Sequence, residues 1–200
     1  METSQLKKII QEKATSIAGC VSAAAEIDKY AESGKINRKK VAVLSNFTLN
    51  GIAEALKANA FLNNIFIDVY SGNYGQWQQE LMGNNLYDFE PEIIFLILDR
   101  CGVDSDIYNS YHLMPEDEIE SYFKNYLAEI YKLVDVAKEK TKAKIVVSNI
   151  SDFWSNILGI AEGRAKNSLW RYIKRANLSL EQKYVNDHQV LIFDLDGWLG

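Results

Sequence analysis

Five short runs of nearly continuous hydrophobic residues stand out along the chain. They cover residues 41–44, 65–69, 93–98, 145–147 and 190–193. Strands buried on both faces of a parallel sheet have this character, whereas strands with one solvated face alternate between polar and apolar residues. The runs therefore predict five parallel strands.

Hydrophobic residues recur at helical spacing between these runs, over residues 50–59, 74–82, 116–142 and 168–184. An earlier stretch, residues 4–32, predicts one long or two short amphipathic helices with Gly34 as the C-terminal cap. Pro115 and the acidic residues after it suit the start of the longest helix. Strands alternating with helices predict a three-layer α/β/α sandwich around a five-stranded parallel sheet.

The 200 residues are enough for one domain with a substantial core. We divide the chain into an N-terminal helical extension, residues 1–37, and an α/β domain, residues 38–200. Only 2 Pro and 11 Gly occur, so no linker or low-complexity segment is expected between them.

Charge and targeting signals narrow the function further. Lys and Arg number 22 and Asp and Glu number 27, giving a net charge of −5 that disfavours nucleic acid as a partner. No apolar run approaches the ~20 residues of a membrane span, and the N-terminus is no secretory signal, so a cytoplasmic location is expected. Cys20 and Cys101 lie far apart without a CxxC pattern, so we expect free thiols, no metal and no cofactor.

Small polar and charged residues follow the predicted strands. In open parallel sheets, ligands bind in the crevice beyond the carboxyl ends of the strands, near the topological switch point. The candidate binding residues are Asn46, Thr48, Gly72, Asp99, Arg100 and Asn149, beside Ser45 as a candidate nucleophile. The alternative is that Ser45, Asn46 and Thr48 merely cap the following helix.

A Ser-His-Asp hydrolase needs a histidine as the base for its serine. His188 precedes the fifth strand, which puts it at the wrong end of the sheet, and His112 lies in a loop after the third strand. Ser45 with His112 as a distant base is therefore the hydrolytic alternative.

Residues 190–197, VLIFDLDG, resemble the opening of haloacid-dehalogenase phosphatases. There the first Asp attacks phosphorus and the second handles the leaving-group proton, positions held here by Asp194 and Asp196. Trp198 stands where Thr or Val is expected. We interpret this segment as the last strand of the domain.

The ordered succession of several segments resembles the N-terminal domain of FkbH-like proteins, the haloacid-dehalogenase subfamily IIIC group. The segments are VLSNFTL (43–49), GNYGQWQQEL (72–81), LYDFEPE (86–92), IVVSN (145–149) and IKRANLSL (173–180). The likeness spans roughly residues 38–200.

This resemblance implies an SGNH/GDSL-hydrolase-like domain with flavodoxin-like strand order 2-1-3-4-5, followed in longer proteins by a phosphatase-like domain that uses Mg²⁺. The resemblance also implies a likeness of some members to enzymes that load a glyceryl unit onto an acyl carrier protein. Ser45-Asn46-Phe47 replaces the GDS block of the hydrolases, and Gly197 and Leu199 occupy the positions of the DxxH histidine. An intact triad is therefore not expected.

The resemblance and the strand-exit residues together suggest a module that binds or presents an acyl-carrier arm or a small acidic metabolite to a downstream phosphatase or glyceryl-transfer domain. The fragment alone is then not expected to be an enzyme. A divergent esterase using Ser45 and a structural spacer are the alternatives.

Overall fold

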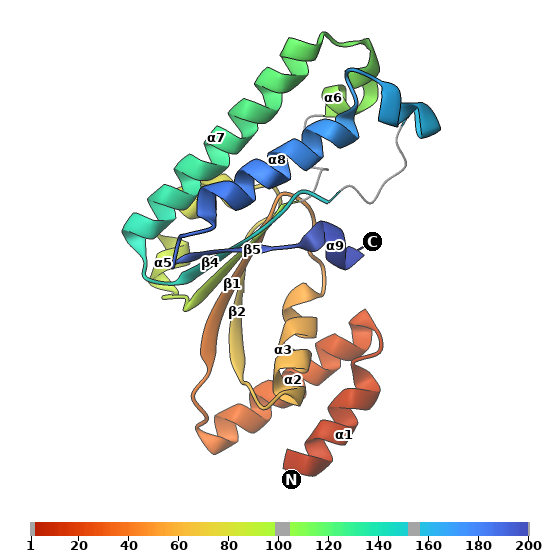
Figure 1. Ribbon diagram of the computed structural model, residues 1–200. Coiled ribbons are helices and arrows are strands. Elements are labelled where there is room, and N and C mark those ends of the chain that lie inside the picture. Colours follow the sequence, from red (N-terminus) through yellow and green to blue (C-terminus); the bar gives the residue numbers. More distant parts are fainter. Residues whose placement is uncertain (1–2, 99–104, 152–156, 200) are drawn as a thin grey trace.

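A computed structural model describes residues 3–98, 105–151 and 157–199 of the chain (Figure 1). Asp99, Arg100 and Cys101 lie outside the described residues. The strands are β1 (Lys39–Ser45), β2 (Ile67–Ser71), β3 (Ile93–Ile97), β4 (Lys144–Ser148) and β5 (Val190–Phe193). The α-helices are α1 (Thr3–Lys13), α2 (Ile17–Gly34), α3 (Ile52–Leu62), α4 (Trp77–Met82), α5 (Asn85–Asp88), α6 (Ser105–Ser110), α7 (Glu116–Lys140), α8 (Leu169–Tyr184) and α9 (Leu195–Leu199), with 3₁₀ turns η2 (Tyr111–Leu113) and η3 (Gly159–Arg164).

The five strands form one parallel sheet in the order β2-β1-β3-β4-β5, which confirms the predicted fold and strand order. Strand β2 begins two residues later than predicted. Asn64 adopts a left-handed conformation (φ 63°) in the preceding turn, which leaves Ile65 half exposed. Phe66 instead packs against the N-terminal helices.

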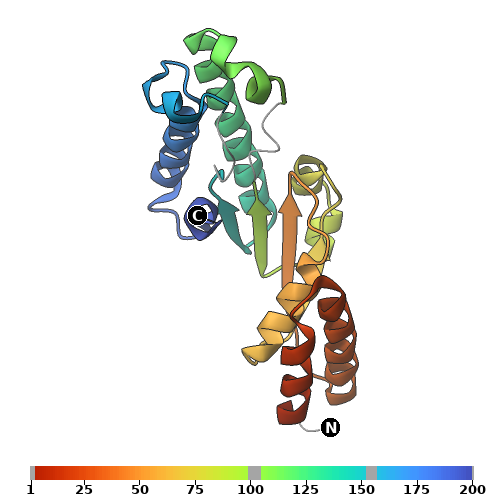
Figure 2. The ribbon, with the colours of Figure 1, turned by 90° about the vertical axis from the view of Figure 1, so that its right-hand side faces the viewer.

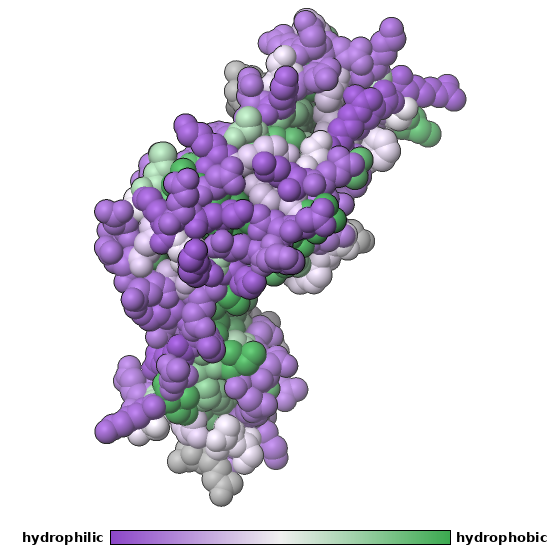
Figure 3. All heavy atoms as spheres, turned by 60° about the vertical axis from the view of Figure 1, so that its left-hand side comes forward, coloured by the Kyte–Doolittle hydropathy of each residue, from purple (hydrophilic) through white to green (hydrophobic). Residues whose placement is uncertain are grey.

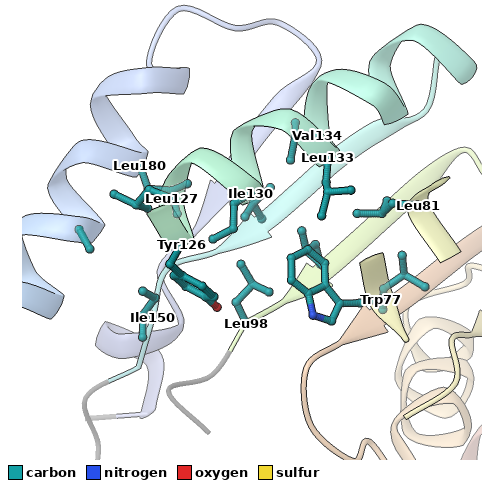
Figure 4. Close-up of a cluster of buried hydrophobic side chains, with 14 of the residues drawn as sticks. Trp77, Leu81, Leu98, Tyr126, Leu127, Ile130, Leu133, Val134, Ile150 and Leu180 are labelled. Carbon is teal, nitrogen blue, oxygen red and sulfur yellow. The ribbon is translucent and has the colours of Figure 1, made fainter. Parts of the chain in front are cut away.

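One face of the sheet is covered by α4, α7 and α8, which together enclose the main hydrophobic core. Figure 4 shows Trp77 and Leu81 of α4 and Ile130 and Leu133 of α7 gathered near Leu98 at the end of β3. All five side chains are buried. Burial of this apolar area is the main favourable contribution to folding.

Helix α3 packs beside β2 on the opposite face, and α1 and α2 pack on α3 (Figures 1 and 2). Their shared core comprises Leu6, Ile10, Ala23, Ile27, Ala58 and Phe61. Polar groups tie the same elements together, because Asp28 of α2 accepts hydrogen bonds from Arg38 at 2.9 Å and from Lys57 of α3 at 2.9 Å. Arg38 also donates to Asp68 of β2 at 2.8 Å.

The N-terminal stretch forms two helices. The Ser16 hydroxyl accepts the backbone N–H of Gly19 at 3.1 Å and so caps the start of α2. The predicted cap at Gly34 is one residue too early. Gly34 remains helical, and Lys35 adopts the left-handed cap conformation with φ 49°.

The upper part of the molecule, which contains α7 and α8, has a mostly hydrophilic surface in Figure 3. Hydrophobic residues reach the surface at the narrow middle of the molecule. Among the helices of the described ranges, none combines the length and apolar character needed to cross a membrane.

Candidate functional site

The carboxyl ends of β1 and β3 form the topological switch point of the sheet. The chain leaves β1 toward β2 on one side, whereas it leaves β3 toward β4 on the other. A crevice outside the strand ends is expected at such a point. Of the residues that the structure describes, Ser45, Asn46 and the loop to α3 lie at this crevice.

Ser45 is buried at the end of β1, and its hydroxyl donates a hydrogen bond to the backbone carbonyl of Phe47. This bond fixes the first turn of the loop and engages the proton that a catalytic base would have to remove. Among the hydrogen bonds of the described residues, none joins Ser45 to His112. The structure therefore places Ser45 at the predicted edge, and among the residues that it describes none is bonded to Ser45 as a catalytic base would be.

Asn46 points from the same turn toward α7, where its side-chain amide lies 3.5 Å from the hydroxyl of Tyr126. Tyr126 is buried, and its ring stacks on Tyr122 with centroids 6.3 Å apart. Both tyrosines line a cleft of about 250 Å³ between α4 and α7. We call this the aromatic cleft; its remaining lining residues are Trp77, Gln78, Asn125 and Glu129.

The exits of β4 and β5 are joined by hydrogen bonds. The side-chain amide of Asn149 donates to the Asp194 carboxylate at 2.7 Å, and its side-chain oxygen Oδ1 accepts the backbone N–H of Asp196 at 3.0 Å. The N–H of Gly197 donates to Asp194 at 3.0 Å. This bond and the Asn149 amide hold the pKa of Asp194 below its ordinary value. Asn149 thus organises the turn into α9, and Asp196 pairs with Lys174 of α8 at 2.5 Å.

The absence of a side chain at Gly72 allows the backbone there to pack closely against Leu44. A Cβ placed there would lie 2.5 Å from Leu44 Cδ2, and the Gly72 N–H donates to the Val43 carbonyl at 2.9 Å. Its neighbour Asn73 donates to the buried carboxylate of Glu80 at 3.0 Å. Thr48 is exposed in the loop toward α3.

The two histidines lie on other segments of the chain. His112 is in η2, with its ring edge-on to Tyr111 at 5.8 Å. His188 is exposed just before β5, at the amino edge of the sheet, as predicted. Within the described ranges, no group of three or more His, Cys, Asp or Glu could hold a metal ion.

Three residues of this region were not singled out from the sequence. Tyr122 and Tyr126 lie within the predicted long helix, where aromatic residues at helical spacing indicate only a core face. Asn177 of α8 is buried and bonds both backbone groups of Ile150, each at 2.8 Å. A polar residue on the otherwise apolar face of a predicted helix was the available signal.

The model of the family described as "FkbH, N-terminal domain" matches residues 40–199. The chain belongs to this family. The match includes the whole sheet from its second residue, the aromatic cleft and both joined strand exits, while α1 and α2 lie outside it.

Two further comparisons add context. No curated protein matches the chain. Among solved structures, the chain is similar to the N-terminal part of the protein BF1531 from Bacteroides fragilis, described as containing a phosphatase domain complexed with Mg. The TM-score is 0.65 at 16% identity, and the match covers 99% of this chain but 46% of that one. The likeness shows the fold, and this chain spans less than half the length of that structure.

Proposed function

We propose that this FkbH N-terminal domain is a binding module for the phosphopantetheine arm of an acyl carrier protein, and that it presents the arm to an accompanying phosphatase-like part. The observation that carries the proposal is the arrangement at the end of β1. Ser45 is bonded to its own loop, while Asn46 and Tyr126 meet beside the aromatic cleft.

The chemistry of the cleft favours the arm over a small acidic metabolite. A phosphopantetheine arm is a narrow chain with two amides and a hydroxyl, which match aromatic faces and side-chain amides. Gln78 and Asn125 supply amides there, and the rings of Trp77 and Tyr122 supply apolar surface. Glu129 would repel a carboxylate ligand. Any Mg²⁺ belongs, in this proposal, to the phosphatase-like part.

The test measures binding of an acyl carrier protein with and without its phosphopantetheine arm, by isothermal titration calorimetry. The armed form should bind and the bare form should not. Asn46→Ala and Tyr126→Phe each remove one polar partner, and each should weaken binding by about 1 kcal/mol, or roughly fivefold. Asn59→Ala, on the exposed side of α3, is the matched control.

Equal binding of the armed and bare carriers, or unchanged affinity in both variants, would contradict the proposal. A screen with ester substrates tests the hydrolytic alternative: turnover that disappears in Ser45→Ala would favour an esterase with Ser45 as nucleophile. Neither binding nor turnover would favour a structural spacer.

A further inference from the structure

The two faces of the sheet differ in how completely they are covered. On β3 and the residue after it, the side chains that face α7 are fully buried, namely Ile94, Leu96 and Leu98, each 0% exposed. The alternate residues on the opposite face are only partly buried, namely Ile93, Phe95 and Ile97. All six are large and apolar, so the difference comes from what lies over each face.

The same asymmetry continues across β4 and β5. Phe95 pairs in register with Val146, and Val146 pairs with Leu191, so these side chains share one face. Leu191 is 51% exposed, whereas its neighbour Val190, on the α7 side, is 1% exposed. We call the residues Ile93, Phe95, Ile97, Val146, Leu191 and Phe193 the open sheet face.

A groove deepens this surface at its carboxyl end. The groove has a volume of about 440 Å³ and lies between α3, which contributes Ile52 and Leu56, and α9, which contributes Trp198. Phe95, Ile97 and Phe193 are among the strand residues that line it. Trp198 is 73% exposed, so the groove is open toward solvent along α9.

The width of the open sheet face indicates what kind of structure would cover it. Strands β3 to β5 span two strand spacings, about 10 Å. An α-helix with its side chains is about 10 Å across, so one helix would fill the width beside α3. A single alkyl chain would fill the groove but leave Val146 and Leu191 uncovered. Helix α9 lies on the same face of the sheet as α3 (Figure 1), because residues of both helices line this groove.

We propose that a helix of the phosphatase-like part packs on the open sheet face beside α3 and joins that part to this domain. This inference rests on the proposed function, in which such a part accompanies the domain. Two observations favour this occupant over an unrelated partner. First, residues of α9 line the groove. Second, the Bacteroides fragilis structure is described as containing a phosphatase domain, and the matched region covers only 46% of that chain.

The test is cysteine accessibility in residues 1–200 and in the longer chain that carries the phosphatase-like part. Leu191→Cys probes the open sheet face. Leu178→Cys, on α8, is a matched control because Leu178 is 53% exposed and Leu191 51%. Both are made in a background with Cys20 and Cys101 replaced by Ala. Maleimide labelling of the Leu191→Cys variant should be roughly tenfold slower in the longer chain, with no change for the Leu178→Cys variant.

Equal labelling of Leu191→Cys in both chains would overturn the inference. Protection that appears in residues 1–200 alone and grows with protein concentration would assign the face to a second copy and overturn it as well. Carrier binding, measured on the same proteins, distinguishes failure of the docking surface from failure of the proposed function. If the carrier still binds and the thiol of Leu191→Cys is unprotected, only the docking surface is wrong. A gene that encodes no phosphatase-like part would contradict both proposals.

Discussion

Asp187 shows how one carboxylate closes a turn in this molecule. It accepts the backbone N–H groups of Gln189 at 2.8 Å and Val190 at 3.0 Å, and Lys138 of α7 donates to it at 2.5 Å. The hydrogen bond from Lys138, followed by those from the two backbone N–H groups, lowers the pKa of Asp187 from 3.8 to about 2. The residue thereby fixes the entry into β5 against the end of α7.

This pKa shift predicts a pH-dependent contribution to stability. The folded pKa is depressed, so the ionised carboxylate stabilises the fold above about pH 4, and the contribution is lost as pH falls through about 2. Asp187→Asn should lower the free energy of unfolding by about 1 kcal/mol at pH 7. Urea denaturation should show the difference from the unsubstituted chain shrinking between pH 4 and pH 2.

Glu181→Gln, an exposed position on α8, is the control for removing one negative charge. A difference for Asp187→Asn that stays constant down to pH 2 would show that the lost hydrogen-bond geometry, rather than the charge, matters.

At the scale of elements, an aromatic group holds the N-terminal helices onto the domain. Phe61 of α3 meets Phe66 edge-on with ring centroids 5.4 Å apart, and Tyr30 of α2 stacks on Phe66 at 6.2 Å. Phe61 is 1% exposed. The helices α1 and α2 are thus packed onto α3, although they precede the region that matches the family model.

Removing this anchor should therefore weaken the whole domain. Phe61→Ala should lower the free energy of unfolding by about 3–4 kcal/mol, because it opens a cavity in the shared core of α1, α2 and α3. Thermal denaturation measures the loss, and Tyr74→Ala, at a 72% exposed aromatic residue, should change stability little. A small effect at Phe61 would mean that the N-terminal helices form a separate, loosely attached unit.

The elements that were predicted correctly are those whose own residues determine them. The apolar runs of β3 and β5 and the helical spacing from Ile119 to Ala137 needed no partner to be recognised. Helix α9 was not predicted, since its five residues include Gly197 and its first turn depends on Asn149, which follows β4. Tertiary hydrogen bonds of this kind leave no local pattern.

At the scale of the whole molecule, the unequal cover of the sheet could not be predicted, because both faces carry the same residue types. Ile93 and Ile94 are identical neighbours, yet they face opposite layers. The contacts within the candidate site could not be predicted either. The sequence indicated the strand exits and the residues Ser45, Asn46 and Asn149, but the Ser45 bond to Phe47 and the approach of Tyr126 depend on the packed fold.

Substitutions at Ile93 and Ile94 test the unequal cover of the two faces of the sheet. Ile94→Ala should cost about 3–4 kcal/mol of unfolding free energy, because Ile94 is 0% exposed among α7 and the strands. Ile93→Ala should cost about 1–2 kcal/mol, because its side chain is already partly hydrated. Chemical denaturation of residues 1–200 gives both values. Equal losses would mean that something covers the open sheet face in this chain alone.

The position of β1 between β2 and β3 affects how the protein is made. Its partner β2 and the helices α1 to α3 lie within residues 3–71, so they are available early in synthesis. Its other neighbour, β3, begins at Ile93. The 26 residues that follow Ser71 up to Ile97 take roughly 1 to 5 seconds on the ribosome at about 5–20 residues per second. During that time β1 has one unpaired edge, and an unpaired strand edge can pair with another chain.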